Sequence, residues 1–243
     1  PGVREGSRFS EVVEGLEPRW RVDNMGMSGW GLDLMVRALE TFAAKARPDA
    51  VVLAVYTDDF RRLAPRYAGN GYGHPKYQLV NDALVTVPYP VLAWWQRLRL
   101  SEALYRATSP RDDNHYDLNE ALVNRFDSVA RAHGAKPAIL FLPGRGDTEE
   151  DRLRRRTLGA WATRLSIPFR DLTLPIHSAG VEETYITGDR HWNENGHRIA
   201  GEILHSLLAT EVLRNAGKDV ERSRVPAPPW LDSKLDYCRD AGG

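Results

Sequence analysis

Two short, wholly apolar runs set among helical stretches constrain the fold of this chain more than any other feature. Residues 50–56 read AVVLAVY and residues 138–142 read AILFL. Strands that are buried on both faces have this composition, whereas half-exposed strands alternate between apolar and polar side chains. Segments with apolar residues at helical spacing precede and follow each run. This alternation of strand and helix predicts an α/β domain built on a parallel sheet.

The remaining elements follow from the same periodicities and from start and stop signals. In the first half of the chain we expect a helix over residues 10–16, a strand over 20–24 and a helix from Leu32 that ends at Pro48. In the second half we expect a helix over 118–129 stopped by Gly134, a helix opened by a capping box of Thr148 and Asp151, a short strand over 167–172 and a last helix through 199–208.

We expect one domain over residues 1–214, with an insertion at about 61–112 and a polar tail over 215–243. The insertion is rich in proline and aromatic residues. It either folds over the domain near the site or forms a surface segment with its own small apolar cluster.

Composition excludes several classes of protein. The 33 Lys and Arg residues balance 33 Asp and Glu residues, so no net charge attracts nucleic acid or a membrane surface. The arginines at 152 and 154–156 have helical spacing, and we interpret them as a solvated face. Cys238 is the one cysteine, which rules out an intramolecular disulfide and a thiolate metal site. No apolar run approaches the roughly 20 residues that cross a bilayer.

The first residue is Pro1, which we interpret as a cut N-terminus. An export signal or membrane anchor ahead of Pro1 therefore stays open, and the sequence predicts no compartment. In a parallel sheet, the loops at the carboxyl ends of the strands carry the chemistry. Three such loops hold candidate site residues.

The first loop, residues 24–29, reads NMGMSG. Its glycines allow a sharp turn, and backbone amides at the start of a helix stabilise negative charge. The alternative is a strand-to-helix turn with no ligand. Ser28 is a weak candidate nucleophile, because the pattern Gly-x-Ser-x-Gly needs a glycine where Trp30 stands.

The second loop, residues 57–60, reads TDDF and directly follows the apolar strand. Asp58 and Asp59 could bind a metal or act as acid and base. They could equally cap the next segment or pair with Arg61 and Arg62.

The third loop, residues 188–197, reads GDRHWNENGH and precedes the last helix. Asp189 can accept a hydrogen bond from Nδ1–H of His191, which fixes the tautomer and leaves Nε2 as a general base. The alternative is a helix start with Asp189 and Asn193 as caps. A metal site through His191 and His197 is disfavoured, since their spacing of six does not match a helical ligand pair. We expect His197 to pack on the last helix.

Taken in this order, the three loops resemble the sequence blocks of the SGNH/GDSL hydrolase superfamily, and the similarity extends to about Leu213. The family's second block resembles residues 24–29. Residues 56–59 occupy the place of its Gly-x-Asn-Asp block. Residues 189–191 resemble its block of an aspartate shortly before a histidine, in the short spacing found in alginate O-acetyltransferase relatives.

The resemblance implies a three-layer α/β/α flavodoxin-like fold and a Ser-His-Asp triad that contains His191 and Asp189. It places Gly29 and Asp58 at the oxyanion hole. We also predict that Trp192, which adjoins His191, contacts the substrate. It implies neither a cofactor nor a metal.

Two departures from the family pattern change what we expect. No Gly-Asp-Ser occurs in the 243 residues, and residues 1–6 fit the continuation of that block. We therefore expect the serine and the first strand of the sheet just upstream of Pro1, and no activity from this fragment alone. Asp58 stands where the family has asparagine. A carboxylate can only accept a hydrogen bond, and loss of one oxyanion donor typically costs about 10²–10³ in rate.

The expected function is a serine esterase or acylhydrolase that acts on a small-molecule or carbohydrate ester, such as a sugar O-acetyl group. The alternatives are an O-acyltransferase on the same site and an inactive carbohydrate-binding relative. Trp192, Trp94 and Trp95 are either sugar-stacking walls or core residues.

Overall fold

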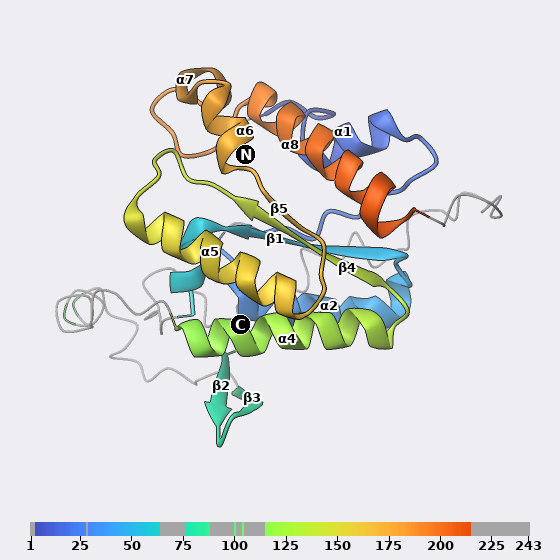
Figure 1. The fold of residues 1–243 in the computed structure, drawn as a ribbon, viewed down its shortest axis with the longest axis vertical. Helices are drawn as coiled ribbons and strands as arrows, with labels where there is room; N and C mark the ends of the chain where they lie inside the picture. The colour runs from blue at the N-terminus through green and yellow to red at the C-terminus, as the bar shows by residue number, and fades with distance from the viewer. Residues whose placement is uncertain are drawn as a thin grey trace.

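A parallel three-stranded sheet lies at the centre of the computed structural model, which describes residues 3–27, 29–63, 76–87, 100, 104 and 115–214 (Figure 1). Its strands are β1 (Ala50–Tyr56), β4 (Lys136–Leu142) and β5 (Phe169–Asp171), in the order β1-β4-β5. All seven residues of β1 lie opposite residues of β4. The predicted α/β class with a parallel sheet is confirmed.

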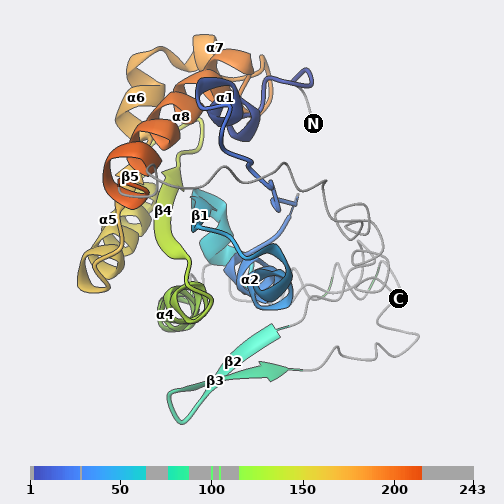
Figure 2. The same cartoon turned by 90° about the vertical axis from the view of Figure 1, so that its right-hand side faces the viewer.

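Helices cover both faces of this sheet (Figure 2). One face carries α2 (Leu32–Ala46), α4 (Tyr116–Ala132) and α5 (Glu149–Arg164), and the other carries α1 (Phe9–Leu16), α6 (Thr173–Ser178), α7 (Val181–Thr184), α8 (Glu194–Leu207) and the π-helical turn η4 (Leu208–Val212). Successive residues of β4 supply the two cores in turn: Ile139 and Phe141 pack toward α4 and α5, whereas Ala138 and Leu140 pack toward α8. This two-sided burial explains why β4 has an apolar run rather than an alternating sequence.

The predicted helix signals are present. Gly134 follows α4 with φ of 74°, a left-handed conformation that glycine adopts without strain. Thr148 accepts from Asp151 N, and the Asp151 carboxylate accepts from Thr148 N, which completes the capping box of α5. At the start of α8, the side chain of Asn193 accepts from two backbone amides.

The strand predicted over residues 20–24 is wrong, because the structure has no strand there. β1 pairs with β4 alone within the described residues, and residues 20–24 run past its other edge without forming a ladder. A strand needs a partner for its backbone, so an extended propensity without a neighbour gives an extended coil.

Part of the predicted insertion forms a small hairpin, of β2 (Lys76–Val80) and β3 (Ala83–Val87), after the 3₁₀ turn η1 (Thr57–Arg61). Tyr77 is 5% exposed, and its hydroxyl donates to Glu40 of α2 at 2.6 Å. The hairpin therefore packs beside α2 and α4. Trp94, Trp95 and the tail over residues 215–243 lie outside the described residues. Within the described ranges, no helix is long and apolar enough to span a bilayer.

We expect Thr148→Ala to lower the free energy of unfolding by about 0.5–2 kcal/mol, because it removes the acceptor for an amide at the start of α5. Urea unfolding followed by circular dichroism measures the change. Thr163→Ala in the same helix is the control, since its hydroxyl only donates back to Gly159 O. Equal effects of the two substitutions would contradict a capping role.

A candidate active site at the carboxyl ends of the strands

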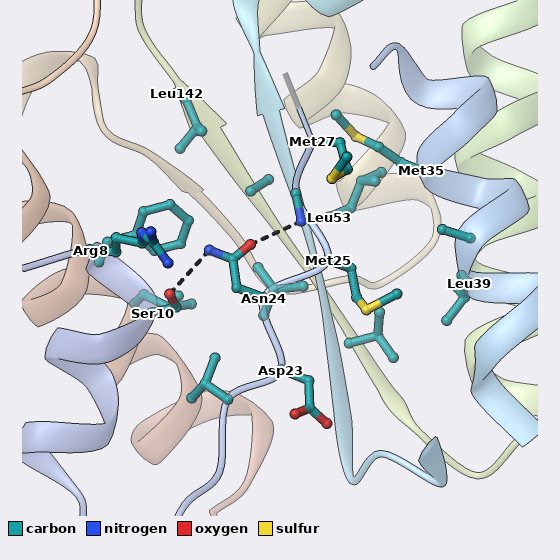
Figure 3. A pocket seen from close by; sticks show the side chains of 18 of the residues that line it. Arg8, Ser10, Asp23, Asn24, Met25, Met27, Met35, Leu39, Leu53 and Leu142 are labelled. Atoms are coloured by element: carbon teal, nitrogen blue, oxygen red, sulfur yellow. Dashed lines mark hydrogen bonds between the residues drawn. The ribbon is translucent and has the colours of Figure 1, made fainter. Parts of the chain in front are cut away.

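A cleft of about 2460 Å³ runs along the outer edge of β1. Residues 20–27 line its opposite wall, and side chains of α2 and α8 also border it. Figure 3 shows Asn24 tied to α1 by donating to Ser10 Oγ at 3.2 Å, with Met25 and Met27 on the side of α2. The lining also includes residues from all three predicted loops: Gly29, Asp58, Arg190, His191 and Trp192.

His191 and Asp189 form the predicted hydrogen-bonded pair. His191 Nδ1 lies 2.7 Å from Asp189 Oδ1. The backbone amides of Arg190 and His191 donate to the same oxygen at 2.5 and 3.2 Å. The bond from the imidazole, followed by these amides, lowers the pKa of Asp189. An ionised Asp189 favours the tautomer with the proton on Nδ1, which leaves Nε2 unprotonated. The two side chains are 57% and 47% exposed.

The local fold explains this arrangement. Gly188 has φ of 74°, and around it Asp189 N donates to Ile186 O while Ile186 N donates to His191 O, both at 2.9 Å. The loop thus closes on itself and holds the carboxylate beside the imidazole. Asn193 caps α8, as the alternative interpretation of the loop required, but the side chain of Asp189 bonds within the loop rather than to α8.

The rings of Trp192 and His197 contact each other edge to face, and both are less exposed than the pair. Trp192 is 8% exposed and belongs to a core cluster with Leu140 and Ile176, so little of its ring faces the cleft it lines. Its substrate-binding role stays a prediction. His197 Nδ1 accepts from Phe9 N at 3.3 Å and its ring stacks on Phe9, which confirms the predicted packing role. Burial lowers the pKa of His197.

Three arginines surround the carboxylate of Asp58. Its oxygens lie 2.5 Å from Arg61, 3.8 Å from Arg154 and 3.9 Å from Arg190. Arg190 adjoins His191, so this contact joins the second loop to the third. The ion pair between Asp58 and Arg61, one of the alternatives that the sequence left open, is therefore present. A carboxylate in this cationic setting accepts hydrogen bonds and supplies no donor to an oxyanion.

Asp59 is 1% exposed and fixes the end of β1. Its carboxylate accepts from Tyr56 N at 2.8 Å and from Arg62 at 2.5 Å, and Arg62 also donates to Trp30 O at 2.8 Å. The second loop is thereby joined to the segment that enters α2. Desolvation is the largest influence and raises the pKa of Asp59 to about 7, against the lowering by Arg62 and the Tyr56 amide.

Arg154 was expected on a solvated face, and that expectation is wrong, since its side chain is 2% exposed. It contacts Thr57 Oγ1 at 3.3 Å and Asp151 at 3.6 Å, and pairs with Glu150. Thr57 in turn donates to Asp151 at 2.5 Å. The missed signal was the spacing of Arg154 to Leu158, which places both on the buried stripe of α5.

Gly29 has φ of 82° in the turn before α2, a conformation that favours glycine. A Cβ atom added there would have no atom within 4 Å apart from its chain neighbours, so conformation rather than space favours glycine at this position. Gly29 and His191 line the same cleft, as the family resemblance requires. Ser28 lies outside the described residues. No group of three or more His, Cys, Asp or Glu side chains in the described part of the chain is arranged to hold a metal ion.

Comparison of the chain with protein-family models, with curated proteins and with solved structures gives no match.

The pKa of Asp59 predicts a pH-dependent stability. An unfolded aspartate has a pKa near 3.8, and the folded value is about 7, so the folded state binds the extra proton between these values. The contribution of Asp59 to the free energy of unfolding is therefore fully present below about pH 4 and is lost as the pH rises through 7. Urea unfolding of the protein and of Asp59→Asn at pH 4–8 measures it as the difference between the two. A difference that is constant over this range would contradict the raised pKa.

Proposed function

We propose that this protein is a serine esterase of the SGNH/GDSL type with a flavodoxin-like three-layer fold, whose serine lies on a segment outside residues 1–243. One observation carries the proposal: the His191–Asp189 pair, joined at 2.7 Å, lies on the cleft that Gly29 also lines. A general base with an orienting carboxylate and a glycine-rich turn at a helix start are the two parts that acyl transfer needs besides a nucleophile.

The chemistry assigns one task to each group. Nε2 of His191 takes the proton of the serine hydroxyl as its oxygen attacks the ester carbonyl, and Asp189 stabilises the imidazolium that forms. The amides of Gly29 and of the serine stabilise the oxyanion of the tetrahedral intermediate. The imidazolium then protonates the leaving alkoxide, which departs as an alcohol. A water molecule, deprotonated by the same imidazole, cleaves the acyl-enzyme.

Asp58 is the residue that most affects how active this site is. At the oxyanion position, its carboxylate repels the developing negative charge, although the pairing with Arg61 and the proximity of Arg190 reduce that repulsion. The substrate we propose is a small-molecule or carbohydrate ester. A sugar hydroxyl in place of water would make the same site an O-acyltransferase. The carboxylate of Asp58 favours, as second candidate, an inactive relative that binds carbohydrate.

The test uses the protein expressed from the complete reading frame that encodes this chain. We expect it to hydrolyse p-nitrophenyl acetate and to be labelled by a fluorophosphonate probe, and residues 1–243 alone to do neither. His191→Ala should abolish both, and Asp189→Asn should lower kcat by about 10²–10⁴, because the imidazole loses the partner that fixes its tautomer.

His133→Ala, at the exposed end of α4, is the matched control and should change neither readout. If the probe does not label the full-length protein, the esterase is excluded and the inactive carbohydrate-binding relative becomes the favoured function. Hydrolysis by residues 1–243 that depends on His191 would instead identify an internal nucleophile such as Ser28.

For the full-length protein we expect Asp58→Asn to raise kcat by about 10–10³, since an amide N–H replaces a repelling carboxylate at the oxyanion. Asp117→Asn, at the exposed first turn of α4, is the control for the loss of one surface charge. An unchanged or lower kcat in Asp58→Asn, with unchanged stability, would show that residue 58 does not face the oxyanion.

A further inference from the structure

The loop that carries the His191–Asp189 pair lies at the surface of the molecule. Residues 187–191 are all exposed. The backbone bonds from Asp189 N to Ile186 O and from Ile186 N to His191 O set the internal shape of the loop, but they do not fix it against the sheet. A catalytic pair has to be held within about 0.5 Å of its productive position. A contact from outside the loop therefore has to place this pair.

Arg145, three residues after the end of β4, makes that contact. Its Nη1 donates to the backbone oxygens of Ile186 and Asp189, each at 3.3 Å. Its Nη2 pairs with Glu182 of α7, and its guanidinium carbon lies 5.9 Å from the centre of the Tyr185 ring. One planar group with several N–H donors thus contacts both ends of the turn and the helix that precedes it.

Arg145 is itself held in place. The residue before it accepts a hydrogen bond from the layer that carries the loop, since Tyr185 Oη donates to Gly144 O at 2.7 Å. His177 Nε2 lies 3.0 Å from the same oxygen. The side chain of Arg145 is only 29% exposed. Hydrogen bonds therefore run in both directions between the segment after β4 and the segment that leads to His191.

The peptide unit between Asp189 and Arg190 links Arg145 to the imidazole. The C=O of this unit accepts from Arg145. Its N–H, which points the opposite way in a trans peptide, donates to Asp189 Oδ1 at 2.5 Å. The same carboxylate oxygen lies 2.7 Å from Nδ1 of His191. Because rotation of this peptide plane would withdraw the amide from the carboxylate, the bond from Arg145 keeps the carboxylate where it orients the imidazole.

We propose that Arg145 is a positioning residue for the His191–Asp189 pair, and that it acts through the peptide between Asp189 and Arg190 to keep the proton of the neutral imidazole on Nδ1. The effect on catalysis rests on the proposed function, whereas the effect on the imidazole needs no nucleophile. Lysine would not replace arginine in this role. Its ammonium group retains the charge, but it lacks the flat fork of donors that reaches two backbone oxygens and a carboxylate together.

The first experiment uses ¹⁵N-labelled residues 1–243 at a pH at which the imidazole is neutral. Long-range ¹H–¹⁵N spectra distinguish a protonated ring nitrogen from an unprotonated one, and we expect the proton of His191 on Nδ1. Arg145→Met should lower the ratio of this tautomer to the Nε2–H tautomer by about two- to tenfold, the effect of one lost hydrogen bond. It should also speed solvent exchange of the Arg190 amide, because that amide no longer has a fixed acceptor.

Arg131→Met is the matched control. Arg131 pairs with Asp127 at 2.7 Å and donates to Leu165 O at 3.3 Å, so it also contacts both a carboxylate and a backbone oxygen, but from α4. Its substitution should change neither the tautomer ratio nor the exchange. Glu182→Ala removes the carboxylate partner of Arg145 and leaves both backbone oxygens. It should lower the tautomer ratio less than Arg145→Met does.

The tautomer ratio decides the proposal. An unchanged ratio in folded Arg145→Met would overturn it, and so would an equal loss in Glu182→Ala, which would place the effect on α7 rather than on the loop. If Arg145→Met does not fold, Arg145→Lys supplies the same readouts, because it retains the charge and most of the side chain. A lower ratio in Arg145→Lys supports the proposal, and an unchanged ratio overturns it.

The full-length protein separates this proposal from the esterase. Arg145→Met should lower kcat for p-nitrophenyl acetate by about 10- to 100-fold and leave KM nearly unchanged, since it displaces the base and not the substrate. If the fluorophosphonate probe does not label the full-length protein, the esterase is overturned, but a tautomer change in Arg145→Met still supports the positioning role. If the full-length protein is active and Arg145→Met changes neither kcat nor the tautomer ratio, the esterase stands and the positioning role is overturned.

Discussion

The parallel pairing of β1 with β4 is the constraint on which the site depends. It aligns the carboxyl ends of the two strands, so the turn after β1 and the segment after β4 emerge at the same edge of the sheet. Tyr185, which is 1% exposed, donates to Gly144 O just after β4 at 2.7 Å. An isolated bridge then joins Tyr185 to Trp192. The loop that holds His191 is thereby anchored to the strand end, although the imidazole itself is exposed.

The parts of the fold that the sequence predicted are those with local causes. The apolar runs of β1 and β4, the capping box at Thr148 and the glycine after α4 each act within a few residues. The strand over residues 20–24 failed because its formation depends on a neighbour that no local pattern reports. The hairpin of β2 and β3 was missed inside a segment whose prolines and aromatics hid a two-residue turn, with Asn81 and Asp82 both at positive φ. The short helices α6 and α7 were missed because one or two turns carry too little periodicity.

The candidate site also has a part that could be predicted from local sequence and a part that could not. The pair of Asp189 and His191 was predictable because two residues in one tight loop are within reach whatever the rest of the chain does. The contact of Asp58 with Arg190 was not, since it depends on how β1 and the loop before α8 are brought together. Arg154 was misread because four arginines in five residues suggest a solvated face. Only its register with the buried stripe of α5 shows that it faces inward, toward Thr57.

Two features that look separate, the half-buried strand and the exposed dyad, have one physical origin. Within the residues that the structure describes, no strand covers the outer edge of β1, and the His191–Asp189 pair borders the same cleft. Water in that cleft screens the attraction between the carboxylate and an imidazolium, so the pair contributes little to stability in this state. The same groups act far more strongly on a developing charge once water is excluded and their positions are fixed. Exclusion of water from the cleft would therefore bury the apolar side chains of β1 and, for the esterase that we propose, strengthen the electrostatic effect of the pair.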